Sequence, residues 1–350
     1  DCAFHGTFIS FVVKGGYPLV ASGPFLLVLD PQNGGRITVE NSFLPPSGME
    51  TVDSIALAGD YAIVQDFSNG RVGVYDVRNP KAPLEKGSAR FATGSVVELF
   101  YDAPYLYAIL PLRWNPEGAF TGDTHAVICH FPDPGDLATF DSTPANAQSP
   151  VNLGDTALQS ATLENGILYC ATPSVVEMVD VTTPSSPALA GRFDDSGFHP
   201  HNQPVGVAVS GDLRVVGDLA GLTAFDRGGA RTSYLLTGSW ISGGFFYYKP
   251  FSLDREGRLG LISFEGEGVQ VVDFSSVTPR RLGFWENTVG GSSGYVNDSL
   301  LMPSGQIAYV ATEDTTQGAL ARGRIVILSL ANPDKPEEAG SYQPSGAQAG

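Results

Sequence analysis

Short apolar runs alternate with turns rich in glycine, proline and aspartate along the whole chain. In the stretch "SIALAGDYAIVQD", for example, two short apolar runs flank a Gly-Asp turn. Runs of this kind, separated by tight turns, are typical of antiparallel strands joined as hairpins. The pattern therefore predicts an all-β fold built from many short strands.

One phrase recurs through the chain: an apolar strand that ends on Asp and is often followed by Pro. "VGVYDVRNPKAP" ends its strand on Asp76, and "VVEMVDVTTPSSP" ends its strand on Asp180. The marked positions are 30, 76, 130, 180, 226, 273 and 329, with His130 and Ser329 replacing the aspartate in two copies. Each copy follows an upstream hairpin and precedes another short strand, so one unit contains four antiparallel strands.

Seven such units predict a seven-bladed β-propeller, because a four-stranded unit cannot bury its own faces and neighbouring blades must cover one another. The prediction is a single domain over residues 1–345, followed by a tail at 346–350. The expected blades are approximately 3–45, 46–92, 93–148, 149–195, 196–241, 242–288 and 289–345. The first unit begins at the N-terminus and the last ends near Tyr342, so we expect the ring to close without a shared strand.

The phrases around Asp76 and Asp180 resemble the LVIVD repeat of bacterial and archaeal surface or secreted proteins. This resemblance implies a propeller and often an exported location, but it implies no common reaction and no catalytic residue. We interpret the aspartate of the repeat as structural, because a carboxylate in a turn can accept hydrogen bonds from backbone N–H groups.

Charge and composition narrow the range of partners. The chain has 37 acidic and 20 basic residues, for a formal net charge of -17, which would repel nucleic acid and anionic membranes. No apolar run is long enough to span a bilayer. The first residue is Asp1 rather than Met, so we expect a mature chain after removal of an export signal, located outside the cell, in the periplasm or on the cell surface.

Three cysteines, Cys2, Cys129 and Cys170, are too few and too widely spaced for a disulfide scaffold or a structural zinc site. Cys129 and Cys170 lie in apolar strands and are interpreted as buried thiols. His125 and His130, near Cys129, are assigned to structural packing.

In a propeller, the first strand of each blade lines the central channel and begins at one mouth of that channel. Ligands usually bind around this mouth, so the candidate binding and catalytic residues are those near the start of each first strand. Aligning the units on Gly15, Gly59 and Gly211 gives His5 and His201 equivalent positions on blades one and five. His199 lies two residues before His201. The other residues expected at this mouth are Glu50, Asp53, Glu98, Gln159, Asn202, Gln203, Trp240, Tyr247, Tyr248, Lys249 and Asn297.

These residues suit several functions. The first is binding of a small polar molecule, a saccharide or a protein partner, with no cofactor required. The second is a lyase, hydrolase or isomerase with His201 or His199 as general base and His5 or Lys249 assisting. The third is a divalent metal site, zinc or similar, held by His5, His199 and His201 with Glu50 or Asp53.

A structural role for the histidines, bonding loop backbone at the mouth, is the fourth reading. The sequence favours binding over catalysis.

Overall fold

The structure, a computed structural model, describes most of the strands and the shorter turns of the chain. The described residues are 10–23, 25–33, 36–66, 69–90, 98–110, 113–114, 120–121, 125–146, 151–152, 160–172, 175–193, 206–217, 221–225, 231–236, 251–253, 258–264, 268–276, 278–287, 295–302, 304–314 and 322–342.

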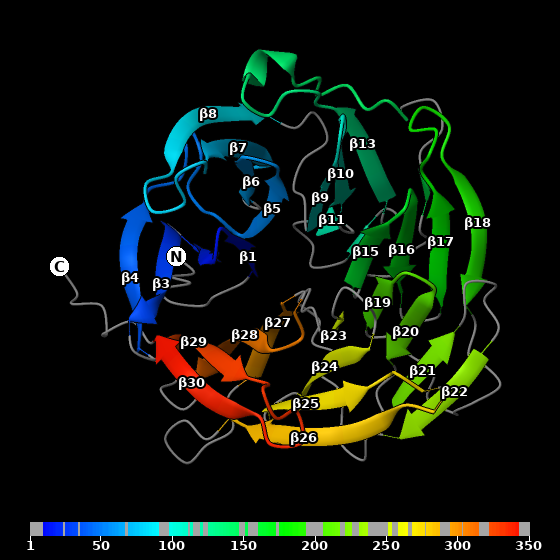
Figure 1. Cartoon of the computed structure of the whole chain (residues 1–350). Helices are drawn as coiled ribbons and strands as arrows, with labels where there is room; N and C mark the ends of the chain where they lie inside the picture. The colour runs from blue at the N-terminus through cyan, green and yellow to red at the C-terminus, as the bar shows by residue number, and fades with distance from the viewer. Residues whose placement is uncertain are drawn as a thin grey trace.

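The described strands form seven four-stranded antiparallel sheets, arranged as blades around a common centre (Figure 1). Each blade takes its four strands in chain order, from the centre outward. The third blade also carries a small inserted hairpin, β11 (Arg113–Trp114) paired with β12 (Phe120–Thr121). The predicted all-β, seven-bladed propeller is therefore confirmed.

The strands fall into four sets by their position in the blade. The inner strands are β1 (Ser10–Lys14), β5 (Ser54–Ala58), β9 (Glu98–Asp102), β15 (Ser160–Glu164), β19 (Gly206–Ser210), β23 (Phe251–Leu253) and β27 (Tyr295–Leu301). The second strands are β2 (Tyr17–Ser22), β6 (Tyr61–Asp66), β10 (Tyr105–Leu110), β16 (Ile167–Ala171), β20 (Leu213–Gly217), β24 (Leu259–Phe264) and β28 (Ile307–Asp314).

The third strands are β3 (Phe25–Asn33), β7 (Arg71–Asp76), β13 (His125–His130), β17 (Val176–Asp180), β21 (Gly221–Phe225), β25 (Gly268–Asp273) and β29 (Arg322–Ser329). The outer strands are β4 (Arg36–Phe43), β8 (Leu84–Arg90), β14 (Val151–Asn152), β18 (Ala188–Phe193), β22 (Arg231–Leu236), β26 (Arg280–Glu286) and β30 (Glu337–Tyr342). The upper face is the one where inner strands begin, and the lower face is the one where they turn into second strands.

Both faces of the middle strands are apolar because each face packs against a different blade. In β6, Ala62 and Val64 pack against the first blade, whereas Ile63 between them packs against the third. All three side chains are fully buried. Successive residues of a strand point to opposite faces, so an unbroken apolar run is what a blade between two neighbours requires.

The core consists of layers between the blades. The described residues form seven hydrophobic clusters, and each of them joins two neighbouring blades. The cluster that joins the last blade to the first includes Phe11, Leu29, Tyr309 and Ile325. Strand β1 lies beside β27, and β4 lies beside β30, at this junction. The ring closes blade to blade, as predicted, because every sheet is made of one continuous stretch of chain.

In six of the blades, the register between the third strand and the outer strand shifts within the sheet. The register shifts at Val28/Leu29, Val74/Tyr75, Met178/Val179, Ala224/Phe225, Gln270/Val272 and Ile327/Leu328. Most of these shifts lie directly before the marked position of the repeat. A β-bulge of this kind bends the strand that carries the extra residue.

Loops that follow the third strands reach back to the preceding blade. Lys81, in the second blade, places its ammonium 4.9 Å from the centre of the Tyr17 ring, 3.7 Å from the Asp30 carboxylate and 3.6 Å from that of Glu40. In the last blade, the carbonyl of Pro333 accepts a hydrogen bond of 2.8 Å from the backbone N–H of Gly283 in the sixth. These loops connect the blades by polar contacts outside the apolar layers.

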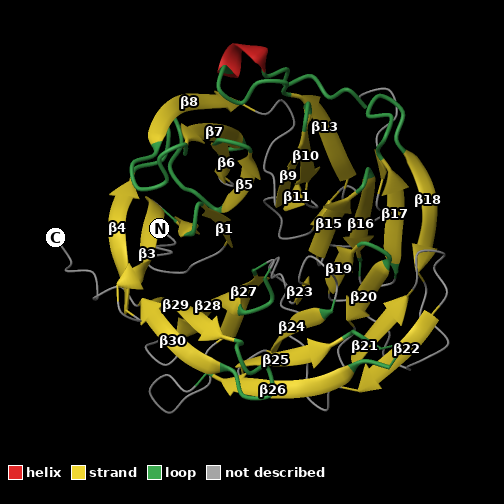
Figure 2. Ribbon diagram, in the orientation of Figure 1, coloured by secondary structure: helices red, strands yellow, loops and turns green. Residues whose placement is uncertain are grey.

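The third blade departs from the regular unit. Its outer strand β14 pairs with β13 through His125 and Ala126, so this sheet extends past the predicted limit at residue 148. The segment between β13 and β14 includes a short 3₁₀ helix, Leu137–Thr139, at the rim of the molecule (Figure 2). Leu137 and Phe140 pack against the apolar layer between the second and third blades, which ties this longer segment to the ring.

Candidate functional site

A buried carboxylate organises the upper end of the second blade. Asp66, the last residue of β6, has no exposed surface. Its carboxylate accepts hydrogen bonds from the backbone N–H of Glu50 (2.7 Å), the backbone N–H of Asn69 (3.1 Å) and the Asn69 side chain (2.9 Å). The Thr51 hydroxyl lies 3.2 Å away. One side chain thus joins the segment that enters β5 to the turn between β6 and β7.

The hydrogen bonds keep Asp66 ionised despite its burial. Burial alone raises the pKa of this carboxyl, but the hydrogen bonds from Glu50, Asn69 and Thr51 together outweigh that effect and hold the pKa below its ordinary value. Asp66 is therefore negatively charged in the folded protein, and its charge is the acceptor for the backbone N–H groups of Glu50 and Asn69.

Glu50 and Asp53, two of the predicted ligand-binding residues, lie in the segment that Asp66 holds. Glu50 is exposed, and Asp53 is half-buried. The Thr51 hydroxyl lies 2.7 Å from the Asp53 carboxylate, and the Asp53 backbone N–H donates to the carbonyl of Gln65 (2.8 Å). Both residues thus lie directly before the inner strand β5, on the upper face, and their binding of a ligand stays a prediction.

Of the other predicted site residues, two, Glu98 and Asn297, lie in the described part of the chain. Glu98 is the first residue of β9 and pairs with Ile109. Asn297 lies in β27 where the register with β28 shifts, between Val296 and Asp298. Ten lie outside the described residues: His5, Gln159, His199, His201, Asn202, Gln203, Trp240, Tyr247, Tyr248 and Lys249. The constellation of histidines, aromatic residues and lysine therefore stays a prediction.

The alignment that paired His5 with His201 is supported at its reference glycines. Gly15, Gly59 and Gly211 have φ angles of 58°, 61° and 57°, so all three occupy the left-handed region in the turn after an inner strand. On the second blade, however, the position equivalent to the two histidines is Met49, which is 8% exposed and packs in the layer between the first two blades. That position faces the core on blade two.

Asp66 and Asn69 were not predicted as part of the site, although the sequence contains a signal for them. The stretch "QDFSNG" places an Asp at the end of a strand and Asn-Gly three residues later. Aspartate side chains often accept hydrogen bonds from backbone a few residues ahead in turns. The link from Asp66 back to Glu50, in contrast, spans two strands and is visible only in the fold.

A cavity of about 520 Å³ lies along the inner strands of the first four blades. It is lined by Val12 and by residues 55–57, 99–102 and 163–165. The aliphatic part of the lining comes from the strands, and the polar part, Asp102, Glu164 and Asn165, comes from their lower ends. The sequence did not predict this polar lower end.

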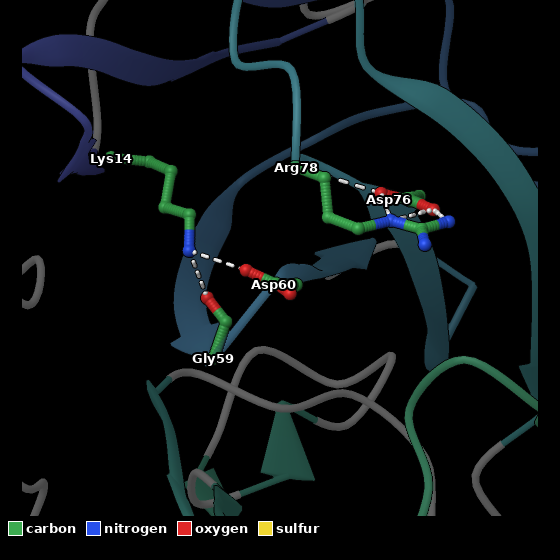
Figure 3. A network of polar contacts seen from close by, with 5 residues as sticks. All are labelled: Lys14, Gly59, Asp60, Asp76 and Arg78. Carbon is green, nitrogen blue, oxygen red and sulfur yellow. Dashed lines mark hydrogen bonds and ion pairs between the residues drawn. The ribbon is translucent and has the colours of Figure 1, made fainter.

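Three aspartates of the repeat, Asp76, Asp180 and Asp273, have the structural role that the sequence predicted. The carboxylates of Asp76, Asp180 and Asp273 each accept a hydrogen bond from the backbone N–H two residues ahead, at 3.1, 2.9 and 2.8 Å. Asp76 also binds the guanidinium of Arg78 (Figure 3). The hydrogen bonds from the Arg78 side chain and backbone lower the pKa of Asp76 to about 2.

Cys129 and His130, on β13, make packing contacts. Cys129 is fully buried and free, and burial raises the pKa of its thiol to about 12. Cys170 is likewise fully buried. The His130 ring meets the Tyr105 ring edge-on, with their centres 5.4 Å apart. Cys129 is therefore a packed thiol that does not ionise at neutral pH.

Among the described residues, no three His, Cys, Asp or Glu side chains lie close enough together to hold a metal ion. No helix in the described ranges has the length and apolar character to cross a membrane.

Comparison with solved structures supports the fold. The chain is similar to one in the crystal structure of a mitotic checkpoint complex, with a TM-score of 0.60 and 14% identity over 88% of this chain and 86% of that one. It is also similar to Raptor from Chaetomium thermophilum, with a TM-score of 0.62 and 12% identity over 88% of this chain and 27% of that one. Identities this low show a shared fold alone.

Comparison of sequences identifies the repeat. No curated protein matches the chain. The LVIVD repeat matches residues 51–90, which contain the whole sheet of the second blade, and residues 175–195, which contain β17 and β18 of the fourth. The two stretches include Asp76 and Asp180, whose carboxylates close the turns after the third strands. The chain is therefore a seven-bladed β-propeller in which two stretches match the LVIVD repeat.

Proposed function

We propose that this propeller is a binding protein whose upper face holds a small polar ligand at the mouth of the channel. The observation that carries the proposal is the Asp66 carboxylate, which fixes the backbone of Glu50 and the Asn69 turn by hydrogen bonds of 2.7 to 3.1 Å. A binding segment that is already ordered loses little conformational entropy when a ligand arrives. Glu50 and Asp53 are then carboxylates held ready to accept hydrogen bonds.

The chemistry of this segment favours ligands with several hydroxyl or N–H groups. Carboxylates accept hydrogen bonds at both oxygens and bind such donors more strongly than neutral acceptors do. A saccharide or another polyhydroxylated molecule presents donors of this kind. A protein partner with exposed donor groups would use the same residues.

Replacing both carboxylates tests the proposal. Saturation-transfer NMR with a panel of monosaccharides, disaccharides and polar metabolites identifies ligands of the wild-type protein. We expect the affinity of such a ligand to fall at least about tenfold in the Glu50→Gln/Asp53→Asn variant, because a charge-assisted hydrogen bond is about twice as strong as the neutral bond that an amide can make, and a loss of about 1.4 kcal/mol is tenfold.

The matched control is Glu286→Gln/Asp334→Asn, which removes two exposed charges from the sixth and seventh blades. It should bind the ligand as the wild type does. Equal affinities in the two double variants, or no ligand in the whole panel, would contradict a site at the upper mouth.

A metal-assisted reaction is the alternative that His5, His199 and His201 would support, and it is tested without knowledge of the substrate. Elemental analysis of protein purified without a histidine tag should find about one equivalent of zinc or a similar ion if those residues form a tight site. The His201→Ala variant should lose it. Metal below about a tenth of an equivalent would leave binding without metal as the function of this face.

We also propose that the protein acts outside the cell, in the periplasm or on the cell surface. The supports are the formal net charge of -17 and the exported location that the LVIVD repeat often implies.

A further inference from the structure

The third blade protects its outer edge differently from the other blades. Its outer strand β14 pairs only with His125 and Ala126, the first two residues of β13, whereas β8 of the second blade pairs along the whole of β7. The described pairing of β13 with β14 also lacks the shift in register that the other six blades carry. Residues 141–146, the edge cover, lie along the rest of this edge.

A buried side chain takes the place of an outer strand here. Asn146 is 2% exposed, and its side chain accepts a hydrogen bond from the N–H of Ile128 (3.1 Å) and donates one to the carbonyl of Ala126 (2.9 Å). The backbone N–H of Ala145 donates to the carbonyl of Ile128 (2.7 Å). The edge cover thus satisfies backbone groups of β13 that a longer outer strand would otherwise bind.

Hydrogen bonds, and not apolar packing, attach the edge cover to the blade. At its start, the N–H of Asp141 donates to the carbonyl of His130 (3.0 Å). None of its residues belongs to a hydrophobic cluster of the described structure, whereas Leu137 and Phe140, just before it, pack between the second and third blades. Segments with few apolar contacts open at a lower free energy than the core, so the cover can detach while the blade stays folded.

The strand beneath the cover is well suited to pairing with another strand. Residues 126–129 are Ala-Val-Ile-Cys, with no proline and no charged side chain among them. Val127 and Cys129 face the second blade, and Ala126 and Ile128 face the fourth. Proteins keep an edge of this kind from pairing by bulges, charges, prolines or a covering segment, and β13 has the covering segment.

We propose that, once the edge cover detaches, the outer edge of β13 pairs with the same edge of a second copy of this chain, and that the hydrogen bonds of Asn146 prevent this pairing. The backbone groups that the cover binds belong to Ala126, Ile128 and His130. In an antiparallel pair with twofold symmetry, Ile128 lies opposite Ile128 of the second copy, and each N–H donates to the other carbonyl. Ala126 then lies opposite His130, so the edge is complementary to itself.

The Asn146→Ala variant tests the proposal by sedimentation velocity over a range of protein concentrations. We expect it to dimerise at least about tenfold more tightly than the wild type, because two buried hydrogen bonds no longer compete with pairing. Gly283→Ala is the control, since it disturbs a junction between two other blades and should associate no more than the wild type. Equal association of the two variants would indicate a general loss of stability and would overturn the proposal.

Hydrogen exchange locates the contact between the two copies. The Ile128 amide should exchange at least about tenfold faster in dilute Asn146→Ala than in the wild type, and it should be protected again at concentrations where the dimer forms. Dimers in which Ile128 stays unprotected would place the interface elsewhere. A variant that exposes Ile128 and remains monomeric would show that this edge does not pair, and either outcome rejects the proposal.

The wild-type protein provides a test that does not depend on the folding of a variant. In urea too dilute to unfold the ring, the amide of Ile128 should exchange at a lower urea concentration than that of Tyr107, its partner in β10. Exchange of both amides only on global unfolding would show that the cover does not detach. The net charge of -17 on each copy opposes association, so salt should tighten the Asn146→Ala dimer; a dimer weakened by salt would contradict pairing through this uncharged edge.

Discussion

Replacing Asp66 with alanine should lower the free energy of unfolding by about 3 kcal/mol, because the backbone N–H groups of Glu50 and Asn69 lose a charged acceptor. Asp66 is fully buried, so its removal leaves buried donors without their acceptor. The loss is measured by denaturant unfolding followed by circular dichroism. A comparable loss is expected for Asp66→Asn, whose amide presents a donor to groups that are themselves donors.

The control for this prediction is Asp60→Asn, on the lower face of the same blade. The Asp60 side chain is 57% exposed and pairs with Lys14 at 2.9 Å. Exposed ion pairs contribute about 0–1 kcal/mol, so Asp60→Asn should stay within about 1 kcal/mol of the wild type. If Asp66→Ala were no more harmful than Asp60→Asn, the carboxylate would not organise this segment.

The effect of Asp66 should depend on pH with a definite sign. Its pKa in the folded protein lies below the ordinary value of 3.8, so the contribution of Asp66 to stability is complete above the pKa of the unfolded chain and is lost as pH falls through the folded pKa. The difference in stability between wild type and Asp66→Asn should therefore be constant above about pH 5 and shrink toward about pH 3.

Gly283→Ala should destabilise the junction between the sixth and seventh blades by about 2–3 kcal/mol, through overpacking. A Cβ atom at Gly283 would lie 2.1 Å from Cδ of Pro336 and 2.6 Å from the backbone carbonyl of Asp334. The loop of the seventh blade would have to move, and the hydrogen bond from Gly283 to Pro333 would be strained or lost. Thermal unfolding by calorimetry measures the effect.

Gly16→Ala separates this clash from the general effect of adding a methyl group. Gly16 has a φ angle of 85° and no atom within 4 Å of the position of a Cβ, so its cost is backbone strain alone, about 1 kcal/mol. Gly283 has no such backbone constraint. A smaller loss for Gly283→Ala than for Gly16→Ala would show that the seventh-blade loop yields easily.

The sequence predicted the ring because its decisive signals are local. A middle strand such as β6 must be apolar on both faces to lie between two blades, and the unbroken run "YAIV" records that requirement directly. The turn carboxylates of Asp76 and Asp180 also act within two residues of themselves. Both kinds of pattern can be read without knowing which segments meet.

The candidate sites depend on contacts between segments that are distant in the chain. Asp66 reaches Glu50 across β5 and β6, and Glu164 reaches Gly211 in the next blade. No local sequence motif indicates either of these two contacts. The cavity likewise brings together residues from four blades, so the negative charge at its lower end becomes apparent only when the strands are placed around a centre.

The irregular pairing of the outer strands has a consequence for how such a protein can grow. A propeller displays the free edge of every blade at its rim, and an exposed regular edge is a template for pairing with another molecule. Here the shift in register recurs in six of the blades, next to the marked position of the repeat. A duplication of one unit would therefore copy the outer strand together with its register shift, which makes the edge a poorer template for pairing with another molecule. A ring could then gain blades without gaining edges that promote aggregation.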